Sequence, residues 1–322
     1  MTQFPSAIEH IIVVLAALLN VLLLFLIAKF SSKELGLYKY LLSTIALCDI
    51  IMSLAHGITA PRAFLIGHTF AVTPHALFVE PSRALIICYS SLFTLPFYIM
   101  NIHFLYRYWN IKKPERIHLF TSKPFIFLLI TVGAGAIGFW AWLMTFMGSV
   151  SGTDELARRY ADQYERTNDD AWVTMDYKDN YGQWNHRTIW LMIIFDGLAV
   201  GQCFLAILLS SLTFYHIHAA TAISPTLKSR QRRLLIALCL QTAVPVVCVY
   251  IPYLGLISSP ILALDLGLFP DLCPLLIASF PAWDALVIMI VIKDYRQGLL
   301  SACRSSRIRE ENTNESVHHV DK

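Results

Sequence analysis

The chain has 322 residues, of which 56% are hydrophobic and 15% are charged, and its mean hydropathy is +0.57. Because soluble domains are about 45–50% apolar and about 25% charged, this composition excludes a water-soluble globular protein and indicates a polytopic membrane protein. The formal net charge of +3 is too small to suggest nucleic acid binding.

Seven apolar runs are each long enough to cross a hydrocarbon core of about 30 Å as a helix. The first has no basic segment before it and is too long for a cleavable leader, so we expect it to stay as a signal anchor. The runs predict an all-α bundle of seven transmembrane helices in residues 1–300, and the polar residues 301–322 predict a disordered tail. The spans lie at about residues 7–28, 38–60, 82–106, 124–150, 187–215, 234–257 and 272–292.

Two connections are long. Residues 61–81 are interrupted by prolines and histidines and are interpreted as a loop, with a dipping segment or a hairpin as the alternative. Residues 151–186 form a polar connection whose first part pairs Glu155 with Arg159 at helical spacing, which predicts a short surface helix. The rest of that connection has no clear period.

The distribution of Lys and Arg predicts the orientation. The connections after the first, third and fifth spans carry three, five and four basic residues, and five more follow the seventh span before Glu310. The other side has two around residues 61–81 and none between the sixth and seventh spans; the long connection 151–186 weighs less because of its length. The N-terminus is therefore expected outside the cell and the C-terminus in the cytoplasm.

Three aspartates inside the spans, Asp49, Asp196 and Asp284, should face the bundle interior and have partners there, because an ionisable group at the membrane centre costs about 2.5–3.5 kcal/mol on insertion scales. Asn20, Asp49 and Asp284 lie near the middle of the first, second and seventh spans and could form one polar cluster. Such a cluster is either a switch centre that holds water or a cation, or a static network that sets helix register. Asp196, in the outer part of the fifth span, either faces a ligand cavity or is a packing partner.

Aromatic residues recur at helical spacing in the outer halves of the third and sixth spans. Such a stripe serves either packing or a ligand pocket. The candidates for the pocket are Tyr89, Phe93, Phe97, Tyr250 and Tyr253.

Motifs for enzymatic chemistry are missing from the sequence: there is no P-loop, GxSxG or HExxH. His216 and His218 form one short pair without further ligands, and none of the seven cysteines has metal-binding spacing, so we expect no cofactor and no enzyme. A transporter or channel that uses Asp49 and Asp284 remains the main alternative to a receptor, and a membrane scaffold is a weaker one.

Four segments carry a family resemblance. GLYKYLLSTIALCDI, NIHFLYRYWNI, LIALCLQTAVPVVCVYIPY and FPAWDALVIMIVIKDYRQGLL resemble the nematode serpentine chemoreceptors of the Str superfamily, which are G-protein-coupled receptors. The resemblance implies a receptor that binds an odorant or another small chemical cue and activates a heterotrimeric G protein. It also implies a plasma-membrane location, in the cilia of sensory neurons.

The resemblance assigns roles to individual residues. Arg107, flanked by Tyr106 and Tyr108, takes the place of the third-span arginine that couples to the G protein. The proline of the sixth-span switch is Pro245, and Pro281, Asp284 and Tyr295 stand for the seventh-span switch motif. Tyr106 replaces the acid that usually precedes the arginine, which removes the ionic lock made by that neighbour. The connection 151–186 has no cysteine, so the usual disulfide to the third span cannot form.

The basic segment after the seventh span, LLSACRSS, is interpreted as an amphipathic helix on the inner leaflet. Cys303 within it is a candidate for palmitoylation.

Overall fold

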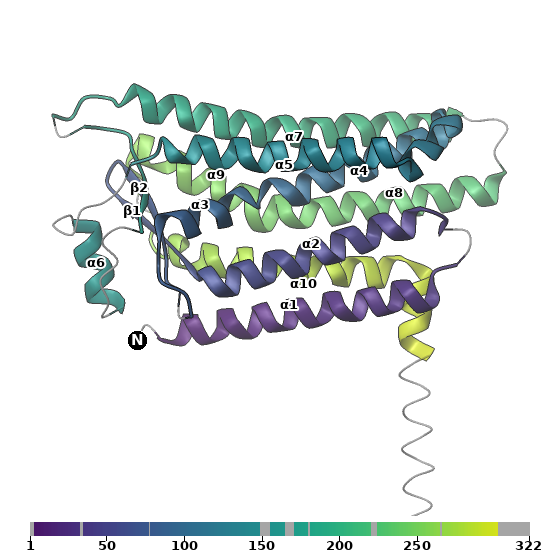
Figure 1. Ribbon diagram of the computed structural model, residues 1–322, viewed down its shortest axis with the longest axis horizontal. Helices are drawn as coiled ribbons and strands as arrows, with labels where there is room; N and C mark the ends of the chain where they lie inside the picture. Colours follow the sequence, from purple (N-terminus) through teal and green to yellow (C-terminus); the bar gives the residue numbers. More distant parts are fainter. Residues whose placement is uncertain are drawn as a thin grey trace, which may run out of the picture.

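The structure is a computed structural model, and it describes residues 3–32, 35–76, 78–148, 155–164, 171–179, 181–219, 224–264 and 266–301. Seven helical segments in this part of the chain are long and apolar enough to cross a membrane, which confirms the predicted number of spans. They lie side by side in one elongated bundle (Figure 1). The molecule is mostly helical, as predicted.

The spans are built from nine α-helices. Two spans are each interrupted and therefore consist of two helices. The helices are α1 (Gln3–Phe30), α2 (Tyr38–Thr59), α3 (Arg83–Ser91) with α4 (Thr94–Lys112), α5 (Lys123–Thr145), α7 (His186–Ala219), α8 (Pro225–Pro245) with α9 (Ile251–Ser258), and α10 (Phe269–Val291).

Prolines explain both interruptions. Pro96 cannot donate a helical hydrogen bond and crowds the carbonyl of Leu92, where the turn between α3 and α4 lies. In the sixth span, Pro252 acts in the same way on Cys248, and the helix widens to a π-turn over Val246–Tyr250. Each break lies in the half of its span that also carries the predicted pocket residues.

The outer helices present apolar side chains to the surroundings. Along α5 and α7, large residues such as Phe127, Ile130, Trp190 and Phe204 are more than half exposed, at 71%, 64%, 63% and 65%. No water-soluble protein would leave such a continuous apolar surface uncovered, so these faces are suited to lipid. Helices α1, α2 and α10 pack against one another through a buried cluster that includes Leu23, Leu42 and Tyr295.

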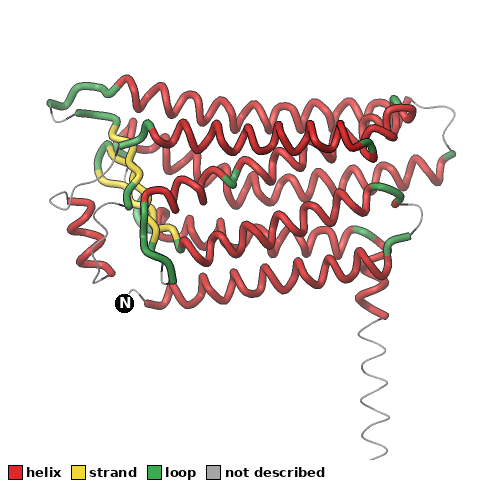
Figure 2. The backbone as a smooth tube through the Cα atoms, viewed as in Figure 1, coloured by secondary structure: helices red, strands yellow, loops and turns green. Residues whose placement is uncertain are grey.

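The structure adds a small sheet that the all-α prediction did not contain. β1 (Pro61–Ile66) and β2 (Thr69–Pro74) form an antiparallel hairpin that turns at Gly67, whose φ of +55° suits glycine. The loop interpretation of residues 61–81 is therefore wrong for the hairpin, and the hairpin alternative is correct. β3 (Val173–Asp176), from the long connection, pairs with β2. Figure 2 shows the three strands together at one end of the bundle.

A short amphipathic helix covers part of the sheet. This helix, α6 (Glu155–Tyr164), confirms the surface helix predicted from the charge spacing, and Arg159 forms an ion pair with Glu155 at 2.9 Å. On its apolar face, Tyr160 packs against two rings: Phe64 of β1 and Trp172, the residue before β3.

We name the two ends of the bundle by these features. The sheet end carries β1 to β3, α6 and the start of α1. The tail end carries the start of α2 and α8 and the end of α4 and α10 (Figure 1). α8 begins at Pro225 rather than at Leu234, because its first two turns are polar and extend beyond the apolar run from which the span was predicted. After Ile292 the chain turns, and residues 293–301 are helical again.

Candidate functional site

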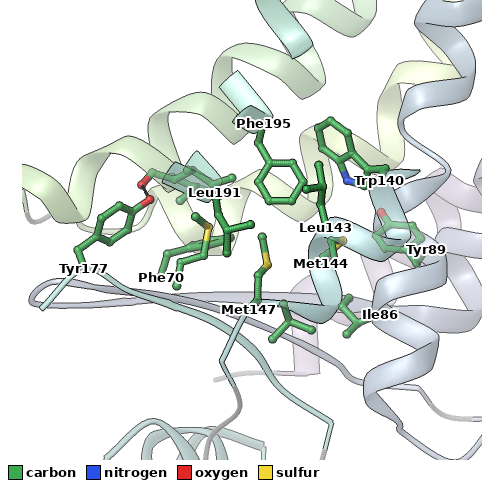
Figure 3. Close-up of a cluster of buried hydrophobic side chains, with 14 of the residues drawn as sticks. Phe70, Ile86, Tyr89, Trp140, Leu143, Met144, Met147, Tyr177, Leu191 and Phe195 are labelled. Atoms are coloured by element: carbon green, nitrogen blue, oxygen red, sulfur yellow. Dashed lines mark hydrogen bonds between the residues drawn. The ribbon is translucent and has the colours of Figure 1, made fainter. Parts of the chain in front are cut away.

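An apolar cavity of about 60 Å³ lies inside the sheet end. Helices and strands far apart in the sequence contribute to its wall. Figure 3 shows part of the surrounding core, a buried cluster to which Phe70 of β2, Met144 of α5 and Tyr89 of α3 all belong. The other wall residues include Phe93 between α3 and α4, Tyr253 of α9 and Cys273 of α10. Burial among such side chains favours small apolar molecules.

The sheet forms the roof of this cavity, and Ala63, Phe70 and Val72 face it from the hairpin. Backbone pairing of β3 with β2 ties the long connection to the hairpin. Thr69 also donates to a carboxylate oxygen of Asp176 at 2.8 Å. The connection that lacks the usual disulfide is thus held by a sheet, and the six cysteines in the described part of the chain are all free.

Two contacts fasten the roof to the end of the sixth span. The hydroxyl of Tyr177 donates to the carbonyl of Ile257 at 2.7 Å, and Nδ1 of His68 donates to the carbonyl of Pro260 at 2.6 Å. Burial, together with the nearby carboxyl group of Asp196, raises the pKa of Tyr177, so the phenol keeps its proton.

The predicted pocket residues fall into two groups. Tyr89, Phe93 and Tyr253 line the cavity. Phe97 and Tyr250 do not line it: their rings stack on each other with centroids 3.6 Å apart, deeper in the bundle. Asp196 does not line it either, and its carboxylate accepts a long hydrogen bond of 3.5 Å from Ser258. The helix spacing used for the prediction could not separate residues that face the cavity from residues that pack below it.

A buried charged cluster, which was not predicted, adjoins the cavity. Glu9 of α1 contacts His56 of α2 at 2.8 Å and Arg62 of β1 at 2.7 Å. The other ring nitrogen of His56 lies 2.5 Å from the hydroxyl oxygen of Tyr89. Glu9 lies inside the first apolar run and Arg62 follows directly after the second, and a charged residue at each of these positions is the signal in the sequence that could have pointed to the pair.

The polar residues near the membrane centre meet only in part. Asp49 and Asp284 line one small cavity of about 10 Å³, together with Pro245, and this volume is close to the minimum for one water molecule. The amide of Gln241 donates to Asp284 at 2.9 Å. Asn20 instead donates to the carbonyl of Pro281 at 2.9 Å, one helical turn away from Asp284.

Arg107 is buried at the tail end, with 3% of its surface exposed. Its guanidinium carbon lies 3.5 Å from the centroid of the Tyr38 ring, and one of its nitrogens donates to Gln231 of α8 at 3.3 Å. No acidic side chain pairs with it among the described residues. The ring of Tyr106 stacks on the same Tyr38 ring that Arg107 contacts, at a centroid distance of 6.0 Å. The ring of Tyr108 instead contacts His216 of α7. Sequence reasoning identified Arg107 but not Tyr38 or Gln231.

Tyr295 is fully buried where the chain turns after α10. Its hydroxyl shares a hydrogen bond of 2.9 Å with Ser31, at the end of α1. Burial raises the pKa of Tyr295 to about 12. Cys303, the candidate for lipidation, lies outside the described residues.

Comparisons with known proteins match this arrangement over nearly the whole chain. Residues 6–300 match the family described as "Serpentine type 7TM GPCR chemoreceptor Str". The chain is similar to the serpentine receptor class r-10 of Caenorhabditis briggsae, with 22% identity over 289 residues that cover 86% of this chain and 84% of the relative. It is also similar to the serpentine receptor class r-10 of Caenorhabditis elegans, with 24% identity over 311 residues that cover 90% and 88% of the two chains.

Proposed function

Because this chain belongs to the serpentine Str family of seven-transmembrane G-protein-coupled chemoreceptors, which are not enzymes, we propose that it detects a small chemical cue in its sheet-end cavity and activates a heterotrimeric G protein. The observation that carries the proposal is the pairing of two features at opposite ends of one bundle. An apolar cavity lies at the sheet end, and a buried arginine that has no acidic partner among the described residues lies at the tail end.

The orientation follows from charge. Lys29, Lys39, Lys112 and Lys228 all lie at the tail end, and by the positive-inside rule this distribution supports a cytoplasmic tail end. The cavity then lies in the half of the bundle nearer the outer side of the plasma membrane, where a chemical cue arrives. By family resemblance, the membrane is that of sensory cilia.

Two spans run from the cavity to the tail end and can transmit occupancy. α10 contributes Cys273 to the cavity and Asp284 to the membrane centre, and the chain after it leads to Tyr295. The sixth span contributes Tyr253 to the cavity and Gln231 to Arg107, and its π-turn lies between them. Proline-associated irregularities of this kind allow one part of a helix to pivot relative to the other.

The mechanism is a shift between two helix arrangements. A ligand that binds one arrangement more tightly raises its population by the difference in binding free energy. In the active arrangement, Arg107 leaves Tyr38 and Gln231 and becomes available to the G protein. A small apolar cue gains its affinity mainly from burial, at about 25 cal/mol per Å² of apolar surface.

The test is ligand-dependent nucleotide exchange on a Gα subunit, measured with purified receptor and with the Arg107→Ala variant. We expect the variant to reach the cell surface and to lose exchange. Exchange that persists undiminished in Arg107→Ala would remove Arg107 from the coupling role. Substrate flux in proteoliposomes without a G protein would favour the transporter instead, and a glycan acceptor placed in residues 151–186 that stays unmodified in cells would overturn the orientation.

A further inference from the structure

Tyr89 connects the cavity with the buried charged cluster. It lines the cavity wall, it is 4% exposed, and its ring packs edge-to-face on both Phe93 and His56. Its hydroxyl oxygen lies 2.5 Å from Nδ1 of His56. The direction of this hydrogen bond therefore decides whether the hydroxyl group can donate to a bound molecule or can only accept from it.

Glu9 determines which nitrogen of His56 carries the proton. Its two carboxylate oxygens are divided between two partners, His56 Nε2 at 2.8 Å and Arg62 at 2.7 Å. The arginine keeps the carboxyl group ionised, and an ionised carboxylate only accepts hydrogen bonds. Nε2 of His56 must therefore be the protonated nitrogen that donates to Glu9.

The charges of the cluster favour a neutral His56. The negative charge of Glu9 is already balanced by Arg62, and all three side chains are buried, with 2% to 7% of their surface exposed. A protonated imidazole would add a third charge to a site with little access to water. In the neutral ring Nδ1 has no hydrogen, so it accepts, and Tyr89 must donate to it. The Tyr89 oxygen is then left with acceptor capacity only.

We infer that the cavity selects small, mainly apolar molecules that carry one hydrogen-bond donor, an O–H or N–H group, which donates to the hydroxyl oxygen of Tyr89. This inference rests on the proposed function and specifies its ligand class. The cavity of about 60 Å³ has less than half the volume of an engineered apolar cavity of about 150 Å³ that binds benzene. The ligand is therefore small, unless flexible walls such as Met144 and Met147 move aside.

The experiment uses three probes with one carbon skeleton of about four carbons: an alcohol, the corresponding ketone and the methyl ether of the alcohol. Binding to full-length receptor in nanodiscs is measured by calorimetry, without a G protein. We expect the alcohol to bind about tenfold more tightly than the other two, the worth of one hydrogen bond. In Tyr89→Phe the three affinities become equal, whereas Tyr181→Phe, which removes a hydroxyl from an exposed side chain outside the cavity wall, keeps the preference for the alcohol.

Glu9→Gln provides the sharper test, because this residue does not line the cavity. The amide of glutamine can donate to Nε2 of His56, which moves the ring proton to Nδ1 and makes Tyr89 the acceptor of that bond. The tyrosine proton then becomes available to the ligand, and we expect the preference to reverse toward the ketone. Glu9→Gln also removes the ionic partner of Arg62. If this prevents the variant from folding, the comparison of wild type with Tyr89→Phe still tests the inference.

Tighter binding of the ketone to the wild type, equal binding of all three probes, or no binding of any probe would each overturn the inference. Failure of the proposed function looks different. If the alcohol binds with the expected preference but no nucleotide exchange follows on any Gα subunit, the ligand class stands and the receptor mechanism falls.

Discussion

The guanidinium carbon of Arg107 lies 3.5 Å from the centre of the Tyr38 ring, in a site where both side chains are at least 97% buried. A cation over an aromatic face gains about 0.5–2 kcal/mol, more when desolvated. Where other receptors hold this arginine with an acid, this chain holds it with a ring on the neighbouring helix and with the amide of Gln231.

Tyr38→Leu is therefore expected to raise ligand-independent signalling. Loss of about 0.5–2 kcal/mol from the resting arrangement increases the active population by about 2- to 30-fold. Basal nucleotide exchange by the purified receptor measures this. Tyr40→Leu is the matched control, because Tyr40 lies on the same helix and is 61% exposed. Unchanged or lower basal exchange in Tyr38→Leu would contradict the proposal that Tyr38 holds Arg107 in the resting arrangement.

The membrane-centre pair Gln241 and Asp284 is expected to control stability. Gln241→Leu leaves the buried carboxyl group of Asp284 without its donor, at a cost of about 1–3 kcal/mol, and should lower the Tm of the detergent-solubilised receptor. In the double variant Gln241→Leu/Asp284→Leu both partners of this hydrogen bond are replaced by apolar side chains, which removes the carboxyl group that Gln241→Leu leaves without its donor. The Tm should then recover most of the loss, and a double variant less stable than Gln241→Leu would speak against this account.

Tyr177→Phe is expected to loosen the roof of the cavity. The variant loses the hydrogen bond to the carbonyl of Ile257, worth about 1 kcal/mol, so backbone amides of β3 should exchange with deuterium several-fold faster. Mass spectrometry of the peptide that contains Val173–Asp176 measures the rate. Tyr181→Phe, at a side chain that is 89% exposed, should leave the rate unchanged.

The same contact has a defined pH dependence. Burial raises the pKa of Tyr177 above its ordinary value of about 10, and the protonated phenol is the donor. Its contribution to stability is therefore complete below about pH 10 and disappears only as the pH rises through the higher pKa of the folded state. The difference in exchange protection of β3 between wild type and Tyr177→Phe should stay constant from neutral pH up to about pH 10 and decrease above it.

Gly298 marks a close approach between α1 and the helical residues after α10. A Cβ atom at this position would lie 2.6 Å from two ring carbons of Phe30, so Gly298→Ala should destabilise the tail end by about 1–3 kcal/mol through overpacking. Replacing the ring as well, in Gly298→Ala/Phe30→Ala, relieves the overlap. A Tm of the double variant that lies at or below that of Gly298→Ala would show that Phe30 is not the obstacle.

The parts of the fold that could be predicted are those encoded locally. Each span is a continuous apolar run, and the spacing of Glu155 and Arg159 revealed α6. The sheet could not be predicted in the same way, because β2 and β3 lie about a hundred residues apart and each strand is short, with prolines at the ends of the hairpin. The polar start of α8 was missed because a helix that leaves the membrane no longer has an apolar sequence.

The candidate site was predictable only by residue type. Arg107, Asp49 and Asp284 stand out as polar residues in apolar runs, yet their partners Tyr38 and Gln241 look like ordinary members of a span. Which aromatic residues reach the cavity depends on the break between α3 and α4 and on the π-turn, which rotate the helix faces relative to a regular helix. Helical spacing alone therefore grouped Tyr89 with Phe97, although only Tyr89 lines the cavity.

The roof over the cavity consists of strands joined through their backbones, without a covalent bridge among the described residues. Main-chain hydrogen bonds do not depend on which side chain a residue carries. Substitutions at Ala63, Phe70 or Val72 can therefore reshape the ceiling of the cavity while its attachment persists. The lining of the roof can thus change by point mutation, and its attachment does not depend on whether the surroundings are reducing or oxidising.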